Sequence, residues 1–428
     1  MHNVGPILGK ELPPHLLTTL RQSGDLAKQM GVAVCMVGGS VRDLLLGRPI
    51  LDVDLVVEGN GIAFARTLGR QTQSPVKAHQ RFGTATITFQ DTFKIDVATA
   101  RTESYGSPAA LPKVKPSSID LDLARRDFTI NTLAVRLNPE HFGQLIDNHG
   151  GLRDLESRTI RVLHDQSFVD DPTRVWRAIR FEQRFGFRLS QRTHKLIHGA
   201  RERKIFSPLS NTRLFEEIVR TLSEKHPRKA LARLAQFNVL GVIHPTLTWS
   251  PSLTALLRSI EQTLEWFKQD DAGAKPTKWV VYFMALMDAL PQGAVAQTLK
   301  QFPLPAIQRK KIQACHTQSG SLLRRLASRS LHYPSSIYHL LVGLPDDTLL
   351  FLRAKSASFS AKQHISAFLR TYQHVEPSVT GDHLKALGLH PGPAYRRILD
   401  QLRDARLNGT IKTEAEEHGL ARKLAKMS

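Results

Sequence analysis

The chain has 428 residues, of which 41% are hydrophobic, and its 59 Lys and Arg against 38 Asp and Glu give a formal net charge of +21. The length exceeds one ordinary hydrophobic core and predicts two to four domains. No apolar run reaches the roughly 18 residues of a membrane span, and two cysteines exclude a disulfide framework. So basic a chain favours a nucleic acid as partner, the alternative being a surface that serves solubility alone. Because the N-terminus lacks a signal pattern, we expect a cytoplasmic protein.

In chain order, the first part of the sequence predicts mixed helices and strands, separated by turn residues. Helical spacing covers residues 17–31, 41–47 and 62–71; short strands are predicted at 32–37 and 51–57, and a hairpin at 84–90 and 93–100. Residues 105–118 form a loop rich in Pro, Ser and Gly, a type that is often functional. Beyond about residue 170 the strand pattern nearly vanishes and amphipathic helices are predicted to the end.

Two aspartates interrupt the strand predicted at 51–57. Asp52 and Asp54 lie on one face of that strand, because side chains alternate along it. Their Cβ atoms are expected about 6–7 Å apart. Two carboxylates at this spacing suit Mg²⁺, which leaves its other ligand positions to water and phosphate. The alternative is a strand end with two solvated acids.

Two glycines precede the aspartates at the end of the previous strand. Gly38 and Gly39 are followed by a predicted helix, so their backbone N–H groups could face a phosphate. Arg42 is one turn into that helix and can reach the same anion. Asp96, in a later strand, can supply a third carboxylate. Together these residues predict a nucleoside triphosphate held over metal ions.

Several segments resemble one known family in the order in which that family carries them. The stretch "VGGSVRDLLLGRPILDVDLVVEG" resembles the signature of the class II tRNA nucleotidyltransferase and bacterial poly(A) polymerase family, in the polymerase β superfamily. Later matches are "RRDFTINTLA", "DDPTRVWRAIRFEQRFGF" and "TRLFEEIVRTL". The resemblance covers nearly the whole chain, and its motifs are specific when taken together.

The resemblance implies a role for each matching residue. Asp52 and Asp54 match the catalytic, metal-binding pair, and Asp96 matches the third catalytic carboxylate. The residues that match nucleotide contacts are Gly38, Gly39, Arg42, Arg125, Arg126 and Asp127. The chemistry agrees, since arginines donate in a fork to phosphates and a carboxylate accepts from ribose hydroxyls.

The segment from Asp170 resembles the family's amino-acid template, which chooses CTP or ATP without a nucleic-acid template. Asp171, Arg174 and Arg177 follow each other at intervals of three and are expected on one helical face. An aspartate can accept from the amine of adenine or cytosine, and arginines can donate to ring nitrogen or carbonyl. The chain has Asp170 where the family usually has Glu.

The 105–118 loop lies where the family has a flexible loop that helps switch specificity from C to A. It carries Pro, Ala and Leu where CCA-adding members tend to have charged residues. This composition is closer to that of A-adding members.

We therefore expect an α+β fold: a polymerase-β-like nucleotidyltransferase head with a mixed sheet, followed by an all-α neck, body and tail. The predicted boundaries are 1–165 for the head, 166–245 for the neck, 246–375 for the body and 376–428 for a tRNA-binding tail. The predicted reaction adds CMP, AMP or both from CTP and ATP to the 3′ end of tRNA, with Mg²⁺ and release of pyrophosphate.

Two alternatives remain open. A bacterial poly(A) polymerase shares every head motif, although the mixed charge of the last segment, "KTEAEEHGLARKLAKMS", favours tRNA over general RNA. A non-catalytic RNA-binding protein could keep the fold, but the intact Asp52, Asp54 and Arg125–Asp127 favour an enzyme. The sequence does not settle which nucleotides are added or the oligomeric state.

Overall fold

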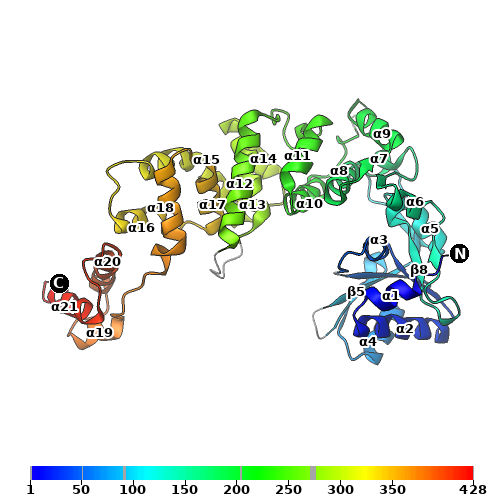
Figure 1. Ribbon diagram of the computed structural model, residues 1–428, viewed down its shortest axis with the longest axis horizontal. Helices are drawn as coiled ribbons and strands as arrows, with labels where there is room; N and C mark the ends of the chain where they lie inside the picture. The colour runs from blue at the N-terminus through cyan, green and yellow to red at the C-terminus, as the bar shows by residue number, and fades with distance from the viewer. Residues whose placement is uncertain (1, 51, 90–92, 203–204, 270–275, 428) are drawn as a thin grey trace. The chain divides into compact units, whose positions relative to one another are not determined.

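The structure, a computed structural model, describes residues 2–50, 52–89, 93–202, 205–269 and 276–427. The chain divides into two compact units: Met1–Glu217 with Gln236–Val239, and Ile218–Ala235 with Leu240–Ser428. The predicted α+β class is confirmed, since the strands belong to the first unit and helices make up the second (Figure 1). Leu51 and Gln90, at the ends of two predicted strands, lie outside the described residues.

A seven-stranded mixed sheet is the centre of the first unit, with strand order β3-β4-β5-β2-β1-β8-β9. Its strands are β1 (Ala33–Val37), β2 (Val53–Glu58), β3 (Val76–His79), β4 (Thr84–Thr88), β5 (Lys94–Thr99), β8 (Ala134–Arg136) and β9 (Leu145–Ile146). Only β2 and β5 run parallel to each other; the other neighbours pair antiparallel. The predicted hairpin is present as β4 and β5, whereas β3 was not predicted.

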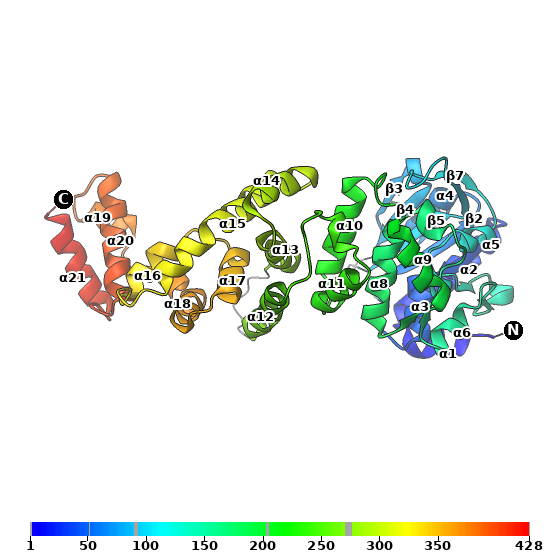
Figure 2. The same cartoon turned by 90° about the horizontal axis from the view of Figure 1, so that it is seen from above.

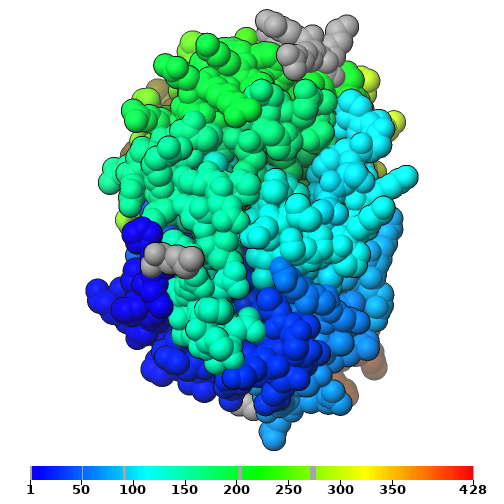
Figure 3. All heavy atoms as spheres, turned by 90° about the vertical axis from the view of Figure 1, so that its right-hand side faces the viewer, coloured from blue at the N-terminus to red at the C-terminus, as the bar shows by residue number. Residues whose placement is uncertain are grey.

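The helices of the first unit lie between and after these strands. They are α1 (Gly5–Glu11), α2 (Pro14–Gln29), α3 (Gly39–Leu45), α4 (Gly61–Gln71), α5 (Ile119–Ala124), α6 (Gly151–Glu156), α7 (Ser167–Asp170), α8 (Thr173–Phe185), α9 (Gln191–Glu202) and most of α10 (Asn211–Leu222). Helices α2 and α4 contact each other and the sheet. Figure 3 shows one face of this unit, where the blue N-terminal part of the chain lies against the later, cyan to green part.

The core beside strands β1, β2 and β8 is made of small and branched apolar side chains. Cys35, Val37, Val56 and Ala134 pack with residues of α5 in one buried cluster. In β2, Asp54 is exposed while Val53 and Leu55 on either side are fully buried. The strand therefore buries the face opposite Asp54, as alternation predicts.

Two short pairings depart from the predicted elements. β7 (Lys113–Pro116) lies inside the region predicted as loop and forms an antiparallel pair with β6 (Arg101–Ser104), which directly precedes that region. Only residues 105–112 connect them, and we call this segment the 105–112 loop. β10 (Thr159–Ile160) pairs with β11 (Arg188–Leu189), so the predicted neck contains one two-residue strand. Both departures are short strands that periodicity cannot distinguish from loop.

The second unit contains helices and no strand among its described residues. Its helices are α11 (Pro227–Gln236), α12 (Pro251–Lys268), α13 (Lys278–Asp288), α14 (Gln292–Gln301), α15 (Ala306–Leu326), α16 (Pro334–Leu341), α17 (Asp346–Lys355), α18 (Phe359–Arg370), α19 (Gly381–Ala386), α20 (Pro393–Leu407) and α21 (Glu414–Ala425) (Figure 2). The last three share a cluster formed by Val379, Leu384, Ile398, Leu402 and Ala421. Among the described helices, none is both long and apolar enough to span a bilayer. The finer boundaries predicted for neck, body and tail stay predictions.

Candidate active site

Three carboxylates meet on the adjacent strands β2 and β5. Asp54 lies directly beside Asp96, because the parallel register pairs these two residues. Asp52 comes one residue before β2 begins, and its charge acts on Asp54, as does that of Asp96. The structure thus brings together the three aspartates that the sequence predicted as catalytic.

The electrostatics of Asp54 reflect this crowding. Its pKa is raised to about 6, chiefly because surrounding protein atoms limit hydration of the carboxylate, although solvent still reaches the side chain. Arg126 opposes this increase, while repulsion from Asp52 and Asp96 adds to it. A carboxylate in such surroundings gains from a neighbouring cation, which stabilises its charged form.

The donor set fits Mg²⁺ held partly by substrate. Among the described residues, no group of three or more His, Cys, Asp or Glu side chains is already arranged to enclose a metal ion. Asp96 accepts a hydrogen bond from the Thr86 hydroxyl, whereas the described residues provide no side-chain hydrogen bond to Asp52 or Asp54. Mg²⁺ is commonly held by one or two carboxylates, with waters and phosphates as its remaining ligands. Asp52 and Asp54 match this arrangement.

The predicted glycine turn connects β1 to α3. Gly38 has φ +68° and ψ −124°, a conformation that side chains disfavour. A Cβ atom at Gly38 would lie 2.5 Å from Nη1 of Arg126. The Arg126 guanidinium therefore rests against the turn, close enough to Asp54 to lower its pKa. Its Nε is buried and has no hydrogen-bond partner among the described residues.

Replacing Gly38 with Ala tests this contact. We expect Gly38→Ala to displace Arg126 and to weaken binding of a nucleoside triphosphate by about 10- to 100-fold, the usual value of a hydrogen bond to a charged group. Gly47→Ala is the matched control, because Gly47 also has a positive φ, +62°, but has no atom within 4 Å of an added Cβ. Calorimetry should show unchanged nucleotide affinity for Gly47→Ala; equal losses in the two variants would remove Arg126 from the explanation.

Arg42 does not lie open to solvent as a phosphate ligand. Its Nε and Nη2 donate to the two carboxylate oxygens of Asp43 at 3.0 and 2.9 Å, and its Nη1 donates to Asn131 at 2.6 Å. Its guanidinium also lies 4.7 Å from the ring of Phe185. Only 6% of the side chain is exposed, so in this structure Arg42 is a paired cation that links α3 to Asn131, and its charge lowers the pKa of Asp54.

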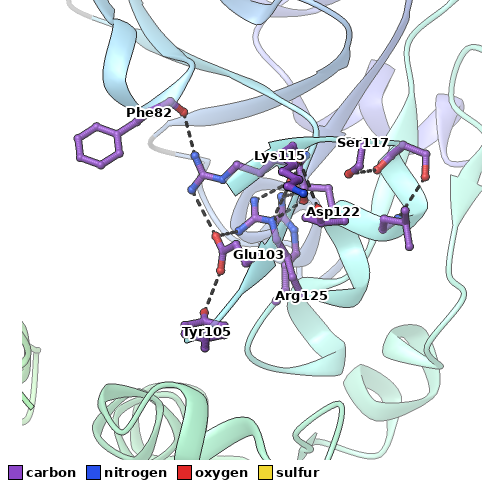
Figure 4. A network of polar contacts seen from close by, with 12 residues as sticks. Phe82, Glu103, Tyr105, Lys115, Ser117, Asp122 and Arg125 are labelled. Carbon is purple, nitrogen blue, oxygen red and sulfur yellow. Dashed lines mark hydrogen bonds and ion pairs between the residues drawn. The ribbon is translucent and has the colours of Figure 1, made fainter. Parts of the chain in front are cut away.

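Arg125 is tied down by two buried carboxylates (Figure 4). Its Nη1 donates to Glu103 at 2.6 Å, while its Nε and Nη2 donate to Asp122 at 3.0 and 2.6 Å. The Asp122 side chain is fully buried and also accepts from Arg126 Nη2 at 3.1 Å. Glu103 further accepts from the Tyr105 hydroxyl at 2.9 Å. The paired arginines are therefore oriented by Asp122, with Glu103 holding Arg125 from the other side.

Asp127 and Arg177, predicted as separate nucleotide contacts, are bound to each other. Arg177 Nε and Nη2 donate to Asp127 Oδ2 at 2.8 and 2.5 Å, and Asn131 donates to Oδ1 at 2.9 Å. Burial alone would raise the pKa of Asp127, but Arg177 and the hydrogen bonds lower it to about 2. The pair joins the end of the RRD segment to α8.

The predicted template residues do not all lie on one helix. α8 begins at Thr173, so Asp171 precedes it, and the expectation of a shared helical face holds only for Arg174 and Arg177. Asp171 Oδ1 instead accepts from the N–H and the hydroxyl of Thr173, the first residue of α8, at 3.0 and 2.6 Å. Arg174 is buried and donates to Ser167 and to the carbonyl of Arg125. Pro172 sets this break, because it stands between Asp171 and the helix.

Three functional neighbours were missed in the sequence. Glu103 and Asp122 hold Arg125, and Arg213 forms an ion pair with Asp171; none of the three was singled out. Asp122 was detectable, since an acid three and four residues before Arg125 and Arg126 is a helical ion-pair pattern. Glu103 and Arg213 gave no such signal, because their partners are distant in the chain.

Known proteins share the sequence pattern and the fold of this chain. Residues 34–161 match the family model described as the poly A polymerase head domain, and residues 186–249 match a probable RNA and SrmB-binding site of polymerase A. A CCA-adding enzyme in an apo form aligns with a TM-score of 0.80 at 32% identity, covering 99% of both chains. The Thermotoga maritima CCA-adding enzyme complexed with tRNA aligns at 0.76 and 31% identity, over 100% of this chain and 99% of its own.

Relatives of similar sequence carry related names. An A-adding tRNA nucleotidyltransferase of Geobacter sulfurreducens is 42% identical over 98% of this chain, which spans 48% of that protein. An A-adding tRNA nucleotidyltransferase of Halalkalibacterium halodurans is 31% identical over 98% of this chain and 95% of its own length. This chain therefore spans about half of the first relative and nearly all of the second. On these matches, the chain belongs to the tRNA nucleotidyltransferase family.

Proposed function

We propose that this chain is an A-adding tRNA nucleotidyltransferase, which transfers AMP from ATP to a tRNA that already ends in CC. Relatives named as A-adding enzymes, from Geobacter sulfurreducens, Aquifex aeolicus and Halalkalibacterium halodurans, are 42%, 34% and 31% identical to it. Relatives named CCA-adding enzymes, from two Streptococcus species, are 28% identical, whereas a CC-adding enzyme of Deinococcus radiodurans and a CCA-adding enzyme of known structure are each 32% identical. The proposal therefore rests on the 42% and 34% identical A-adding relatives. The composition of the 105–112 loop agrees with an A-adding enzyme. We also propose that it acts in the cytoplasm, in line with two buried, unpaired cysteines.

The main support for this activity is the position of Arg126, which lies close to both the glycine turn and the aspartates. Its guanidinium rests against Gly38 and acts electrostatically on Asp54. A triphosphate lying against this turn would place its phosphates between the arginine and the carboxylates, where opposite charges are complementary. The same residues make little sense as a purely RNA-binding surface, because carboxylates repel RNA phosphates.

The chemistry is a balanced phosphoryl substitution. The 3′-hydroxyl oxygen of the RNA forms a bond to the α-phosphorus of ATP, the bond to the β-phosphate oxygen breaks, and pyrophosphate and one proton leave. When bound by Asp52 and Asp54, Mg²⁺ supplies positive charge that neutralises the phosphates and favours the attacking alkoxide. Arg126 holds the phosphates, and Asp122 keeps Arg126 oriented. In this proposal Asp96, which the parallel register pairs with Asp54, assists through its negative charge.

Base choice is assigned to the start of α8. Asp171 Oδ1 is occupied by protein donors, whereas Oδ2 accepts no hydrogen bond from a described residue. We propose that Oδ2 accepts from the exocyclic amine of the incoming base. Arg177 keeps 32% of its side chain exposed beside Asp127 and supplies the donor, while buried Arg174 positions the neighbouring backbone.

The direct test uses labelled tRNA transcripts that end at the discriminator base, at C, and at CC. Each is incubated with Mg²⁺ and ATP, CTP or both, beside an unstructured RNA of equal length. We expect extension of only the CC-ended transcript, by one A, with ATP. Growth of the shortest transcript to CCA would mean a complete CCA-adding enzyme. Long A tracts on the unstructured RNA would mean a poly(A) polymerase, and an inert protein would contradict enzymatic function.

A further inference from the structure

The 105–112 loop is fastened to the rest of the first unit at Ala109. Ala109 is buried and has φ +59°, a conformation uncommon for a residue with a side chain. Its N–H donates to the carbonyl of Val169 in α7 at 3.3 Å. Its carbonyl accepts from Nη1 of Arg213 in α10 at 3.0 Å. Two backbone bonds and burial thus hold the loop at this one residue, which outweighs the cost of its conformation.

The same arginine reaches the proposed base reader. Nη2 of Arg213 lies 2.7 Å from Oδ1 of Asp171 in an ion pair whose side chains are only 21% and 18% exposed. A guanidinium is rigid and planar, so the positions of its two terminal nitrogens are linked. If Nη1 moves with the carbonyl of Ala109, Nη2 moves relative to Asp171. The loop and the carboxylate therefore share one support.

The ion pair also determines which oxygen of Asp171 is available. Oδ1 is contacted by Arg213 and by the N–H and hydroxyl of Thr173. Because Arg213 and Thr173 both hold Oδ1, the carboxylate cannot rotate freely, and Oδ2 stays in one fixed orientation. A fixed acceptor discriminates between bases better than a rotating one, because a misplaced donor then loses its hydrogen bond.

The root of the loop is connected to the phosphate side of the site. The Tyr105 hydroxyl donates to Glu103, which also accepts from Arg125. Arg174 in turn donates to the carbonyl of Arg125. A displacement of the loop is thus resisted at its first residue by Glu103 and at Ala109 by Arg213.

We infer that Arg213 is a positioning residue for base selection: it docks the 105–112 loop through Ala109 and orients Asp171, so that loop docking and the choice of ATP are one event. This inference rests on the proposed function, since it concerns the selectivity of that reaction. Arg213 need not touch the nucleotide. Its effect is transmitted through the position of Asp171 Oδ2.

The first experiment replaces the guanidinium with an uncharged side chain of similar length. Arg213→Met is expected to lower the ratio of kcat/KM for ATP over CTP by about 10- to 100-fold on CC-ended tRNA, the range for losing a hydrogen bond to a charged group. The change should come mainly from the KM for ATP. Arg192→Met is the matched control, because it removes an Arg–Asp ion pair to Asp165, 2.6 Å long, from exposed side chains of the same unit. The control should keep the wild-type ratio.

The second experiment displaces the loop without touching the arginine. Ala109→Pro removes the N–H bonded to Val169 and cannot adopt φ +59°, whereas Ala109→Gly keeps both backbone groups and relieves the conformation. We expect the proline variant to lose ATP selectivity as Arg213→Met does, the glycine variant to keep it, and the double variant of Arg213→Met with Ala109→Pro to lose no more than either alone.

Hydrogen exchange gives a readout that does not require activity. In Arg213→Met the amides of residues 105–112 should exchange faster, while those of β1 and β2 keep their protection. Retained selectivity in a folded Arg213→Met protein would overturn the inference, as would unchanged exchange in the loop. If Arg213→Met does not fold, Arg213→Lys is decisive: a single ammonium on a flexible stem does not fix the relative positions of two partners as the planar fork of a guanidinium does, so selectivity should fall. An inactive wild type would contradict the proposed function instead, while the exchange of the loop would still test its docking.

Discussion

Asp54→Asn is expected to reduce nucleotide transfer by roughly 10³-fold or more, because a metal-held phosphate loses several kcal/mol of transition-state stabilisation with its ligand. The amide keeps the shape of the carboxylate but removes its charge. The charges of Asp52, Asp96 and Arg126 all act on Asp54. The loss of one negative charge leaves the positive charge of Arg126 less compensated, so ATP binding in the absence of metal should not weaken. Single-turnover transfer of AMP to CC-ended tRNA measures the chemical step directly.

A control variant separates an effect on the chemical step from a general effect of replacing an aspartate with asparagine. Asp25→Asn makes the same change at an exposed residue of α2, away from the strands of the site, and should leave transfer at the wild-type rate. Binding of tRNA by Asp54→Asn, followed by a filter assay, should equal that of the wild type. Wild-type turnover in Asp54→Asn would disprove the assignment of the aspartates, whereas loss of tRNA binding would indicate that the substitution disturbed the fold.

The acidic part of the site could be predicted because strand geometry is local. Alternation places Asp54 opposite the buried faces of Val53 and Leu55, and a strand prediction needs no knowledge of distant residues. Asp96 followed from the same rule once a second strand was expected. The register that pairs Asp96 with Asp54 is a tertiary fact, but both residues were named without it.

The arginines could be named but their partners could not. A guanidinium binds whichever acid the fold brings near, and the sequence separation of those pairs is large: Arg177 binds Asp127, and Arg125 binds Glu103. Helical periodicity placed Asp171 on α8, whereas Pro172 separates Asp171 from the helix, and Asp171 accepts from the N–H of Thr173 instead. Such contacts arise from packing, which local patterns do not encode.

Asp122→Ala is expected to destabilise the first unit by about 3–5 kcal/mol, because removal of one partner leaves buried charges uncompensated. The Asp122 side chain is fully buried and accepts from Arg125, from Arg126 and from the N–H of Arg101. Hydrogen exchange of the most protected β2 amides measures the free energy of opening of this unit alone, so unfolding of the second unit does not enter the result.

A neighbour on the same helix provides the comparison. Asp120→Ala removes an exposed acid, two residues earlier in α5, whose side chain accepts from Asn148 at 2.8 Å, and should cost less than about 1 kcal/mol. Nucleotide binding then separates two roles of Asp122. If Asp122 also orients Arg126, the folded fraction of Asp122→Ala should bind ATP more weakly than Asp120→Ala does. Equal ATP affinity would mean that Arg126 finds the phosphates unaided, and that Asp122 acts on stability alone.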